Sequence, residues 1–261
     1  MTTPTEETVR AAGVEMVVIR GGAGKPLLVL HDELGYTGWL SWNERLAQER
    51  SLIIPLQPGF GRTERVDWVR SYRDLAGLYS QIIRELGAAP LDVIAFSAGG
   101  FIAAEMAAAD PKIFSRMVLV APMGIKPVDG EIMDMFAVTV RNHLLATVAD
   151  PAETPEFIKV YGGHITPEQF EAFEDARSET ARIGWEPFMH NPSLPYLLRG
   201  VKIPTLLVWG TRDRIVPRGC IDAYRAAIEG AQVALVEGAG HRPEMERPAE
   251  FDRIVRTFLA A

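Results

Sequence analysis

The chain has 261 residues, of which 48% are hydrophobic and 23% charged, so it can bury the core of a large single domain and is not expected to be disordered. Its net charge of -7 argues against a nucleic-acid partner, which needs a concentrated basic surface, and its one cysteine, Cys220, excludes an intramolecular disulfide. The N-terminus is polar, and no stretch approaches the roughly 20 apolar residues of a membrane-spanning helix. We therefore expect a soluble, cytoplasmic protein with no membrane partner.

Seven short apolar runs predict strands of a largely parallel sheet, because they are continuous, as strands buried on both faces are. In chain order these runs are residues 14–19, 27–30, 52–56, 91–96, 117–120, 206–209 and 233–236. Helical patterns separate several of the runs, at residues 72–86, 101–109, 220–228 and 248–259. This alternation indicates an α/β fold with helices on both faces of the sheet. The glycine-rich residues 21–24 lack the lysine of a phosphate-binding loop and predict a hairpin turn.

The segment between Pro122 and Pro204 breaks the alternation. It spans about eighty residues without a convincing strand, and its best helical patterns are residues 133–145, 167–180 and 185–198. An uninterrupted loop of that length is improbable in a compact domain. We therefore predict a helical cap insertion, residues 123–202, in a core made of residues 1–122 and 203–261.

Ser97 lies at the junction of an apolar run and a helical pattern, in the sequence VIAFSAGG. A tight strand-to-helix turn would lift its hydroxyl clear of the backbone, beside the unpaired N–H groups of a helix N-terminus. Such a turn needs small residues two places either side, and these are Ala95 and Gly99. The pattern is A-x-S-x-G, close to the G-x-S-x-G of a nucleophile elbow. A serine that caps a buried helix is the alternative interpretation of these residues alone.

A nucleophilic serine needs a base, usually a histidine that a carboxylate orients. Among five histidines, His241 lies on a glycine-flanked loop just after the run 233–236, and Asp213 lies just after the run 206–209. The carboxyl ends of parallel strands are where such a sheet places its chemistry. The chain order Ser97, Asp213, His241 is the order described for α/β-hydrolases.

Four motifs along nearly the whole chain carry a family resemblance. They are LVLHDELG, PLQPGFGRT, VIAFSAGGF, and the pair LLVWGTRDRIVP and GAGHRPEMERPAEF. Together they resemble the α/β-hydrolase fold superfamily, in the cap-bearing group of esterases, lactonases, non-haem haloperoxidases and carbon–carbon bond hydrolases. The resemblance implies a mostly parallel eight-stranded sheet with the cap inserted after the sixth strand. It also implies Ser97 as nucleophile, His241 as general base and Asp213 as orienting carboxylate, and the elbow serine argues against a haloalkane dehalogenase or epoxide hydrolase.

The loop after the run 27–30 should supply part of the oxyanion hole. We expect the backbone N–H groups of Glu33 and Ala98 to face the oxyanion. The chain has His31-Asp32 where relatives usually have His-Gly, and Gln57 where they usually have aspartate. A carboxylate at Asp32, beside the oxyanion donors, leads us to expect a neutral, partly apolar small-molecule substrate. Ordinary family variation, with Asp32 facing solvent, is the alternative.

These features predict a serine hydrolase that cleaves a small carboxylic ester through an acyl-enzyme on Ser97, without a cofactor. Cleavage of a carbon–carbon bond next to a ketone is one alternative, because the same triad serves both reactions. A capped-pocket small-molecule receptor with residual hydrolysis is the other.

Two groups of cap residues receive weaker predictions. Three histidines share no metal-ligand spacing, so structural or surface roles and no metal site are expected: His143, His164 and His190. Three apolar residues are expected to cover the site and to influence substrate preference, with core packing as the alternative: Met135, Phe136 and Trp185.

Overall fold

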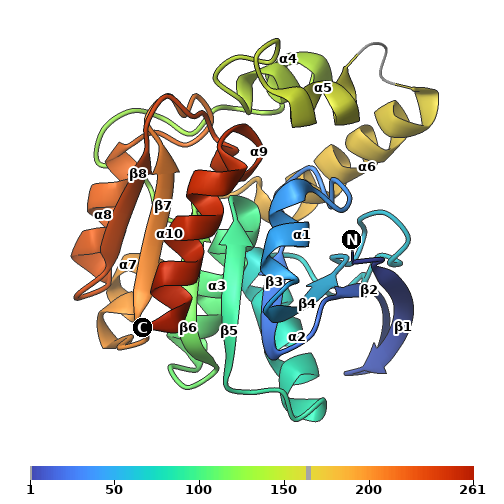
Figure 1. Cartoon of the computed structure of the whole chain (residues 1–261). Helices are drawn as coiled ribbons and strands as arrows, with labels where there is room; N and C mark the ends of the chain where they lie inside the picture. The colour runs from blue at the N-terminus through green and yellow to red at the C-terminus, as the bar shows by residue number, and fades with distance from the viewer. Residues whose placement is uncertain (1, 163–165) are drawn as a thin grey trace.

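Eight strands form one sheet in the order β1-β2-β4-β3-β5-β6-β7-β8 in the computed structural model, which describes residues 2–162 and 166–261 (Figure 1). The strands are β1 (Thr5–Ala11), β2 (Val14–Gly21), β3 (Lys25–Leu30), β4 (Arg50–Pro55), β5 (Leu91–Phe96), β6 (Phe114–Val120), β7 (Thr205–Gly210) and β8 (Gln232–Val236). Strand β2 runs antiparallel to both of its neighbours, and the other pairs are parallel. The predicted mostly parallel sheet is confirmed.

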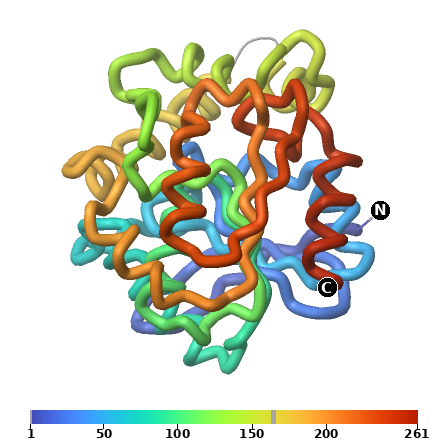
Figure 2. The backbone as a smooth tube through the Cα atoms, turned by 90° about the vertical axis from the view of Figure 1, so that its left-hand side faces the viewer, coloured from blue at the N-terminus to red at the C-terminus, as the bar shows by residue number. Residues whose placement is uncertain are grey.

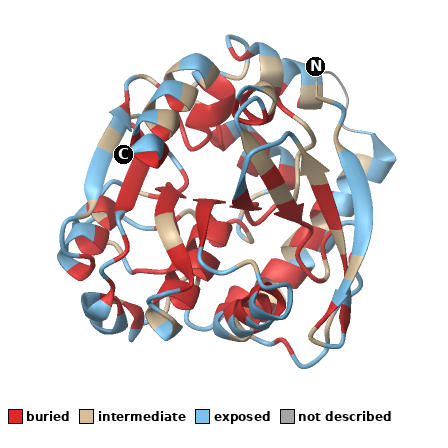
Figure 3. Cartoon of the chain, turned by 60° about the horizontal axis from the view of Figure 1, so that its bottom comes forward, coloured by how far each residue is buried: buried red, intermediate tan, exposed pale blue. Residues whose placement is uncertain are grey.

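Both faces of the central strands are buried under helices, which explains their continuous apolar sequences. Successive residues of β3 alternate between two apolar clusters, with Leu27 and Val29 in one and Leu28 and Leu30 in the other. Helices α1 (Ser41–Leu46) and α10 (Pro248–Ala260) contribute to the first cluster, and α2 (Tyr72–Glu85), α3 (Ala98–Ala109) and α8 (Gly219–Ala227) contribute to the second. Figure 2 shows the molecule from the side that carries α8 and β8, and Figure 3 shows the buried centre of the sheet.

The edge strand β1 and the turn after β2 differ from the sequence prediction. The polar strand β1 was not among the predicted runs, because it is an exposed edge strand with little apolar pattern (Figure 3). It pairs with β2 through a tight turn at Ala12 and Gly13, both of which have positive φ. The hairpin expected at residues 21–24 is wrong, because β2 pairs with β1 and β4 and not with β3. The chain instead crosses β4 on its way from β2 to β3. A side chain at Gly22 would come too close to the backbone of Ala47 and Arg50.

The segment between β6 and β7 is helical. It contains α4 (Val140–Ala146), α5 (Pro155–Tyr161), α6 (Pro167–Gly184), α7 (Leu194–Leu197) and a 3-10 turn (Leu198–Gly200). Figure 1 shows α4, α5 and α6 above the carboxyl ends of the strands, whereas α7 packs against α3 and α8 lower in the molecule. The helices expected at 133–145 and 185–198 are much shorter than predicted. In the described part of the chain, no helix is long and apolar enough to cross a membrane.

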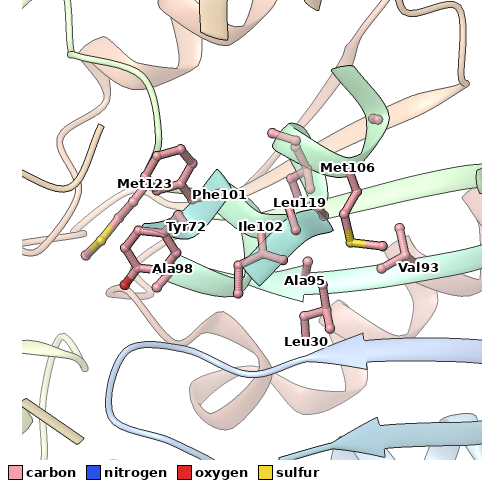
Figure 4. Close-up of a cluster of buried hydrophobic side chains, with 14 of the residues drawn as sticks. Leu30, Tyr72, Val93, Ala95, Ala98, Phe101, Ile102, Met106, Leu119 and Met123 are labelled. Carbon is pink, nitrogen blue, oxygen red and sulfur yellow. The ribbon is translucent and has the colours of Figure 1, made fainter. Parts of the chain in front are cut away.

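Helix α3 brings the backbone of Ser97 close to the neighbouring strands. The helix is apolar on all sides and rich in alanine, so it packs closely between β3, β5 and α2. Ala95, Ala98, Ile102 and Leu30 meet where β5 turns into the helix (Figure 4). This packing holds the first turn of α3 in one position relative to the sheet.

Candidate active site

Ser97 occupies a strained turn between β5 and α3. Its φ of 49° and ψ of -112° lie outside the regions that non-glycine residues favour, a cost of about 1–3 kcal/mol. Two backbone hydrogen bonds hold the turn: Ser97 N–H donates to the Val120 carbonyl at 2.9 Å, and Met123 N–H donates to the Ser97 carbonyl at 3.1 Å. A side chain at Gly99 would come within 2.5 Å of the carbonyls of Leu30 and His31, which is the physical reason for a glycine there.

Asp213 and His241 are in direct contact. His241 Nδ1 lies 2.8 Å from Asp213 Oδ2, and both side chains are buried. The other carboxylate oxygen of Asp213 accepts hydrogen bonds from the N–H groups of Ile215 and Val216, at 2.8 and 2.9 Å. These contacts fix the carboxylate and leave His241 Nε2 as the ring nitrogen free to exchange a proton.

The pKa of His241 is raised to about 9. Burial favours the neutral imidazole and lowers the pKa, but the negative charges of Asp213, Glu33 and Asp32 outweigh it. A histidine in this environment is mostly protonated at neutral pH, so a base made from it works best in alkaline solution.

Ser97 and His241 make no hydrogen bond to each other. Ser97 Oγ and His241 Nε2 are both buried, and neither has a hydrogen-bond partner among the residues that the structure describes. The structure thus joins two of the three predicted residues directly and leaves the hydroxyl of the third without a partner among the described residues. Such hydrogen bonds are often long without substrate and shorten when it binds.

The two expected oxyanion donors are also free. Glu33 N–H and Ala98 N–H donate no hydrogen bond to any group in residues 2–162 and 166–261. His31 supports the loop between them. Its Nε2 accepts from Gln57 N–H at 3.0 Å, so its Nδ1 carries the proton and donates to the Asp32 carbonyl at 2.8 Å. Burial lowers the pKa of His31, which keeps this ring neutral.

Asp32 does not face solvent, and its charge is compensated. Its carboxylate is buried, contacts the guanidinium of Arg242, and accepts from Leu34 N–H at 3.0 Å. Arg242 follows His241 directly and also donates to the Thr37 hydroxyl and the Tyr161 phenol, each at 3.2 Å. Neither sequence interpretation of Asp32 anticipated this pair.

Glu33 is the unforeseen side chain of the site. Its carboxylate is buried, and its Oε1 lies 3.2 Å from Nε2 of His143, a fully buried histidine of α4. The Thr180 hydroxyl of α6 donates to the Glu33 carbonyl at 3.0 Å. Two cap helices therefore contact this one residue. For Glu33, the signal in the sequence was a charged residue in a loop that follows a buried strand. For His143, no pattern in the sequence pointed to this contact.

The other cap residues lie in varied surroundings. Met135 is buried in an apolar cluster, whereas Trp185 is 57% exposed and its ring contacts Phe136 at a tilted angle and Phe188 edge to face. A cavity of about 440 Å³ borders Trp185, and its lining includes none of the three predicted triad residues. His190 Nδ1 donates to the Phe188 carbonyl at 2.8 Å, and His164 lies outside the described residues. Within the described ranges, no group of three or more His, Cys, Asp or Glu side chains could hold a metal ion.

Comparison with known proteins decides the family. The family model described as "Alpha/beta hydrolase family" matches residues 27–254. This chain belongs to that alpha/beta hydrolase family. The match spans the sheet from β3 to β8, the segment between β6 and β7, and most of α10.

Individual relatives of this hydrolase-family chain include more than one kind of enzyme. A 2-hydroxymuconate semialdehyde hydrolase of Pseudomonas sp. (strain CF600) is 27% identical over 272 residues, covering 96% of this chain and 92% of that protein. A 2-hydroxy-6-oxo-6-phenylhexa-2,4-dienoate hydrolase structure from Rhodococcus sp. strain RHA1 matches with a TM-score of 0.78 at 18% identity, over 100% of both chains. The esterase structure from Rhodococcus sp. ECU1013 matches with a TM-score of 0.78 at 20% identity, over 99% and 98%. The two structural matches show a shared fold.

Proposed function

We propose that this member of the alpha/beta hydrolase family is a serine hydrolase that cleaves a small carboxylic ester through an acyl-enzyme on Ser97. The observation that carries the proposal is the contact between His241 and Asp213 beside a serine in a strained elbow. The free N–H groups of Glu33 and Ala98 support it, because an oxyanion hole needs donors that are not already used.

The proposed reaction follows from the hydrogen-bonding capacity of each group. Neutral His241 accepts the Ser97 proton at Nε2 while the hydroxyl attacks the ester carbonyl, and Asp213 stabilises the imidazolium that forms. The N–H groups of Glu33 and Ala98 bind the tetrahedral oxyanion. His241 then protonates the leaving alkoxide, and afterwards it removes a proton from the water that hydrolyses the acyl-enzyme. A rotation of the Ser97 side chain toward Nε2 precedes attack.

We further propose a neutral, partly apolar substrate. The carboxylate that disfavours an anionic substrate is that of Glu33, since Arg242 compensates Asp32. A cavity of about 210 Å³ separates the loop 34–37 from α5 and α6, and most of its lining is apolar or aromatic. This cavity is next to Glu33 in the chain and could hold a small acyl or alcohol group.

Carbon–carbon bond hydrolysis is the second candidate. The similarity to the 2-hydroxymuconate semialdehyde hydrolase of Pseudomonas favours it, and a serine, a histidine and an oxyanion hole could also serve that reaction. A small-molecule receptor would keep the same residues but would show only residual hydrolysis, without efficient multiple turnover. Rates on matched esters and 1,3-diketones separate the two enzyme candidates, and multiple turnover separates both from the receptor.

The test uses a fluorophosphonate probe and a panel of p-nitrophenyl esters. We expect one covalent adduct, on the peptide that contains Ser97, and multiple turnover of a short-chain ester. The variants Ser97→Ala and His241→Ala should lose both while their circular dichroism stays unchanged. Labelling at another residue, or full activity in Ser97→Ala, would overturn the proposal.

A further inference from the structure

A buried carboxylate on the loop of the proposed oxyanion donor has no part in the proposed reaction. The Glu33 side chain is 1% exposed, and its Oε2 has no hydrogen-bond partner among the described residues. The Ser97 hydroxyl is near enough to lower the pKa of this carboxyl. A buried polar oxygen is rarely left unpaired in a protein, and such atoms call for a functional explanation.

The charge of this carboxylate depends on two histidines. Burial raises the pKa of Glu33, but the hydrogen bond with His143 and the positive charges of His241 and His143 lower it below its usual value. Asp32, in contrast, has a permanent cation in Arg242. Of the two carboxylates Asp32 and Glu33, Glu33 is therefore the one whose negative charge is balanced by histidines.

Other ionisable groups surround the pair formed by Glu33 and His241. Those that act on one or both of them are Asp213 after β7, Asp32 and His31 after β3, Tyr72 of α2, His143 of α4, and Arg242 and Glu244 beside α9 (Pro243–Glu246). Asp213 is needed for the orientation of the ring, and Asp32 is bound to Arg242. Glu33 is thus a charge that can be removed without breaking either contact.

We propose that Glu33 is a positioning residue, which acts as a second anionic partner of His241 and is held in place by His143 of the cap helix α4. This inference rests on the proposed function, because it assigns His241 as the base. It means that His143 of the cap helix α4 influences the protonation of His241 through Glu33, in addition to the cover that the cap gives the site. The carboxylate acts on the imidazole through its charge, in addition to the backbone N–H proposed for the oxyanion.

The first test measures the rate of fluorophosphonate labelling of Ser97 against pH, in wild type and in Glu33→Gln. Removal of the negative charge should move the acid limb of the profile to lower pH by about one unit, because a nearby opposite charge shifts a pKa by that order. Relative to its own plateau, the variant should therefore label about tenfold faster at pH 7 than wild type. An unmoved limb, or a limb moved to higher pH, would overturn the proposal.

Three further variants separate charge from structure. Glu33→Asp keeps the charge and should keep the limb within a few tenths of a unit of wild type. His143→Gln replaces the ring with an amide that can donate a hydrogen bond to Glu33, and should leave the limb within a few tenths of a unit of wild type. Glu237→Gln removes an exposed carboxylate four residues before His241 and should leave the profile unchanged. Equal shifts in Glu33→Gln and Glu237→Gln would show a general charge effect and would refute the specific role.

A measurement without chemistry distinguishes the two proposals. The ring carbons of ¹³C-labelled histidine report each imidazole pKa by NMR, and the His241 signal is assigned by its loss in His241→Gln. A lower His241 pKa in Glu33→Gln supports the positioning role even if the probe never labels Ser97, in which case the proposed hydrolase function fails alone. Normal labelling of Ser97 with an unchanged His241 pKa refutes the positioning role alone.

Discussion

Breaking the buried contact between Asp32 and Arg242 should destabilise the protein strongly. The variant Arg242→Met removes the guanidinium and leaves the Asp32 carboxylate with the Leu34 N–H as its remaining contact. The side chains of Asp32 and Arg242 are only 10% and 3% exposed, so water solvates the unpaired carboxylate poorly. Removal of one partner of a buried ion pair costs about 3–5 kcal/mol. The same change removes two hydrogen bonds, to Thr37 and Tyr161, which places the expected loss at the upper end of this range.

A double-mutant cycle isolates the pair from these other losses. Urea unfolding is measured for wild type, Asp32→Asn, Arg242→Met and the double variant. The double variant should be more stable than the sum of the single changes predicts, by about 2–3 kcal/mol, because it leaves no uncompensated charge. The exposed pair of Arg10 and Glu15 is the matched control, and its cycle should give below about 1 kcal/mol. Additivity within about 0.5 kcal/mol at Asp32 and Arg242 would refute the reasoning.

The same variants test what the pair does for substrate choice. The double variant Asp32→Asn with Arg242→Met removes both charges of the pair, so it should discriminate between a methyl ester and its anionic analogue about as wild type does. Arg242→Met alone leaves an unpaired negative charge and should increase discrimination against the anion, and Asp32→Asn alone leaves an unpaired positive charge and should decrease it, both more so at low salt. The measurement is kcat/KM for the matched pair at two ionic strengths. A narrower discrimination in the double variant than in wild type would show that the Asp32 charge acts on the substrate despite Arg242.

Three more outcomes follow from the structure. With the pKa of His241 raised to about 9, kcat/KM for a neutral ester should rise about tenfold per pH unit below pH 9 and level off above it, and an acid limb near 6.5 would contradict this. Burial raises the pKa of Glu244 to about 8, above its unfolded value, so its contribution to stability is present at acid pH and is lost as the pH rises toward 8. Urea unfolding should therefore show the variant Glu244→Gln gaining about 2 kcal/mol relative to wild type between pH 6 and pH 8, and parallel stability curves would refute it. In the cap, thermal and urea unfolding should show that Met135→Ala costs about 2–5 kcal/mol and Trp185→Ala much less, because only the first side chain is buried.

The buried strands of the sheet were predictable, and so was α6 in the segment between β6 and β7, whereas the helices expected at 133–145 and 185–198 were not. A strand buried on both faces, such as β5 or β7, is apolar at nearly every position, and that pattern is visible in the sequence. The edge strand β1 has no such pattern, and it escaped prediction. In residues 185–198 the helical propensity competes with Pro187, Pro192 and Pro195, and only Leu194–Leu197 is helical in the folded chain.

The sequence by itself determined the strands of the sheet other than β1, and it placed Ser97, Asp213 and His241 each after a strand whose apolar residues mark its carboxyl end. Parallel strands place those ends at one edge, so the approximate site follows from local patterns. Only the tertiary structure decided the partners of the charged residues in that site. His143 and Glu33 are 110 residues apart in the chain, and Arg242 and Asp32 are 210 apart. Burial determines how much free energy each of these contacts contributes. Burial depends on how the whole chain packs, and no short stretch of sequence contains that information.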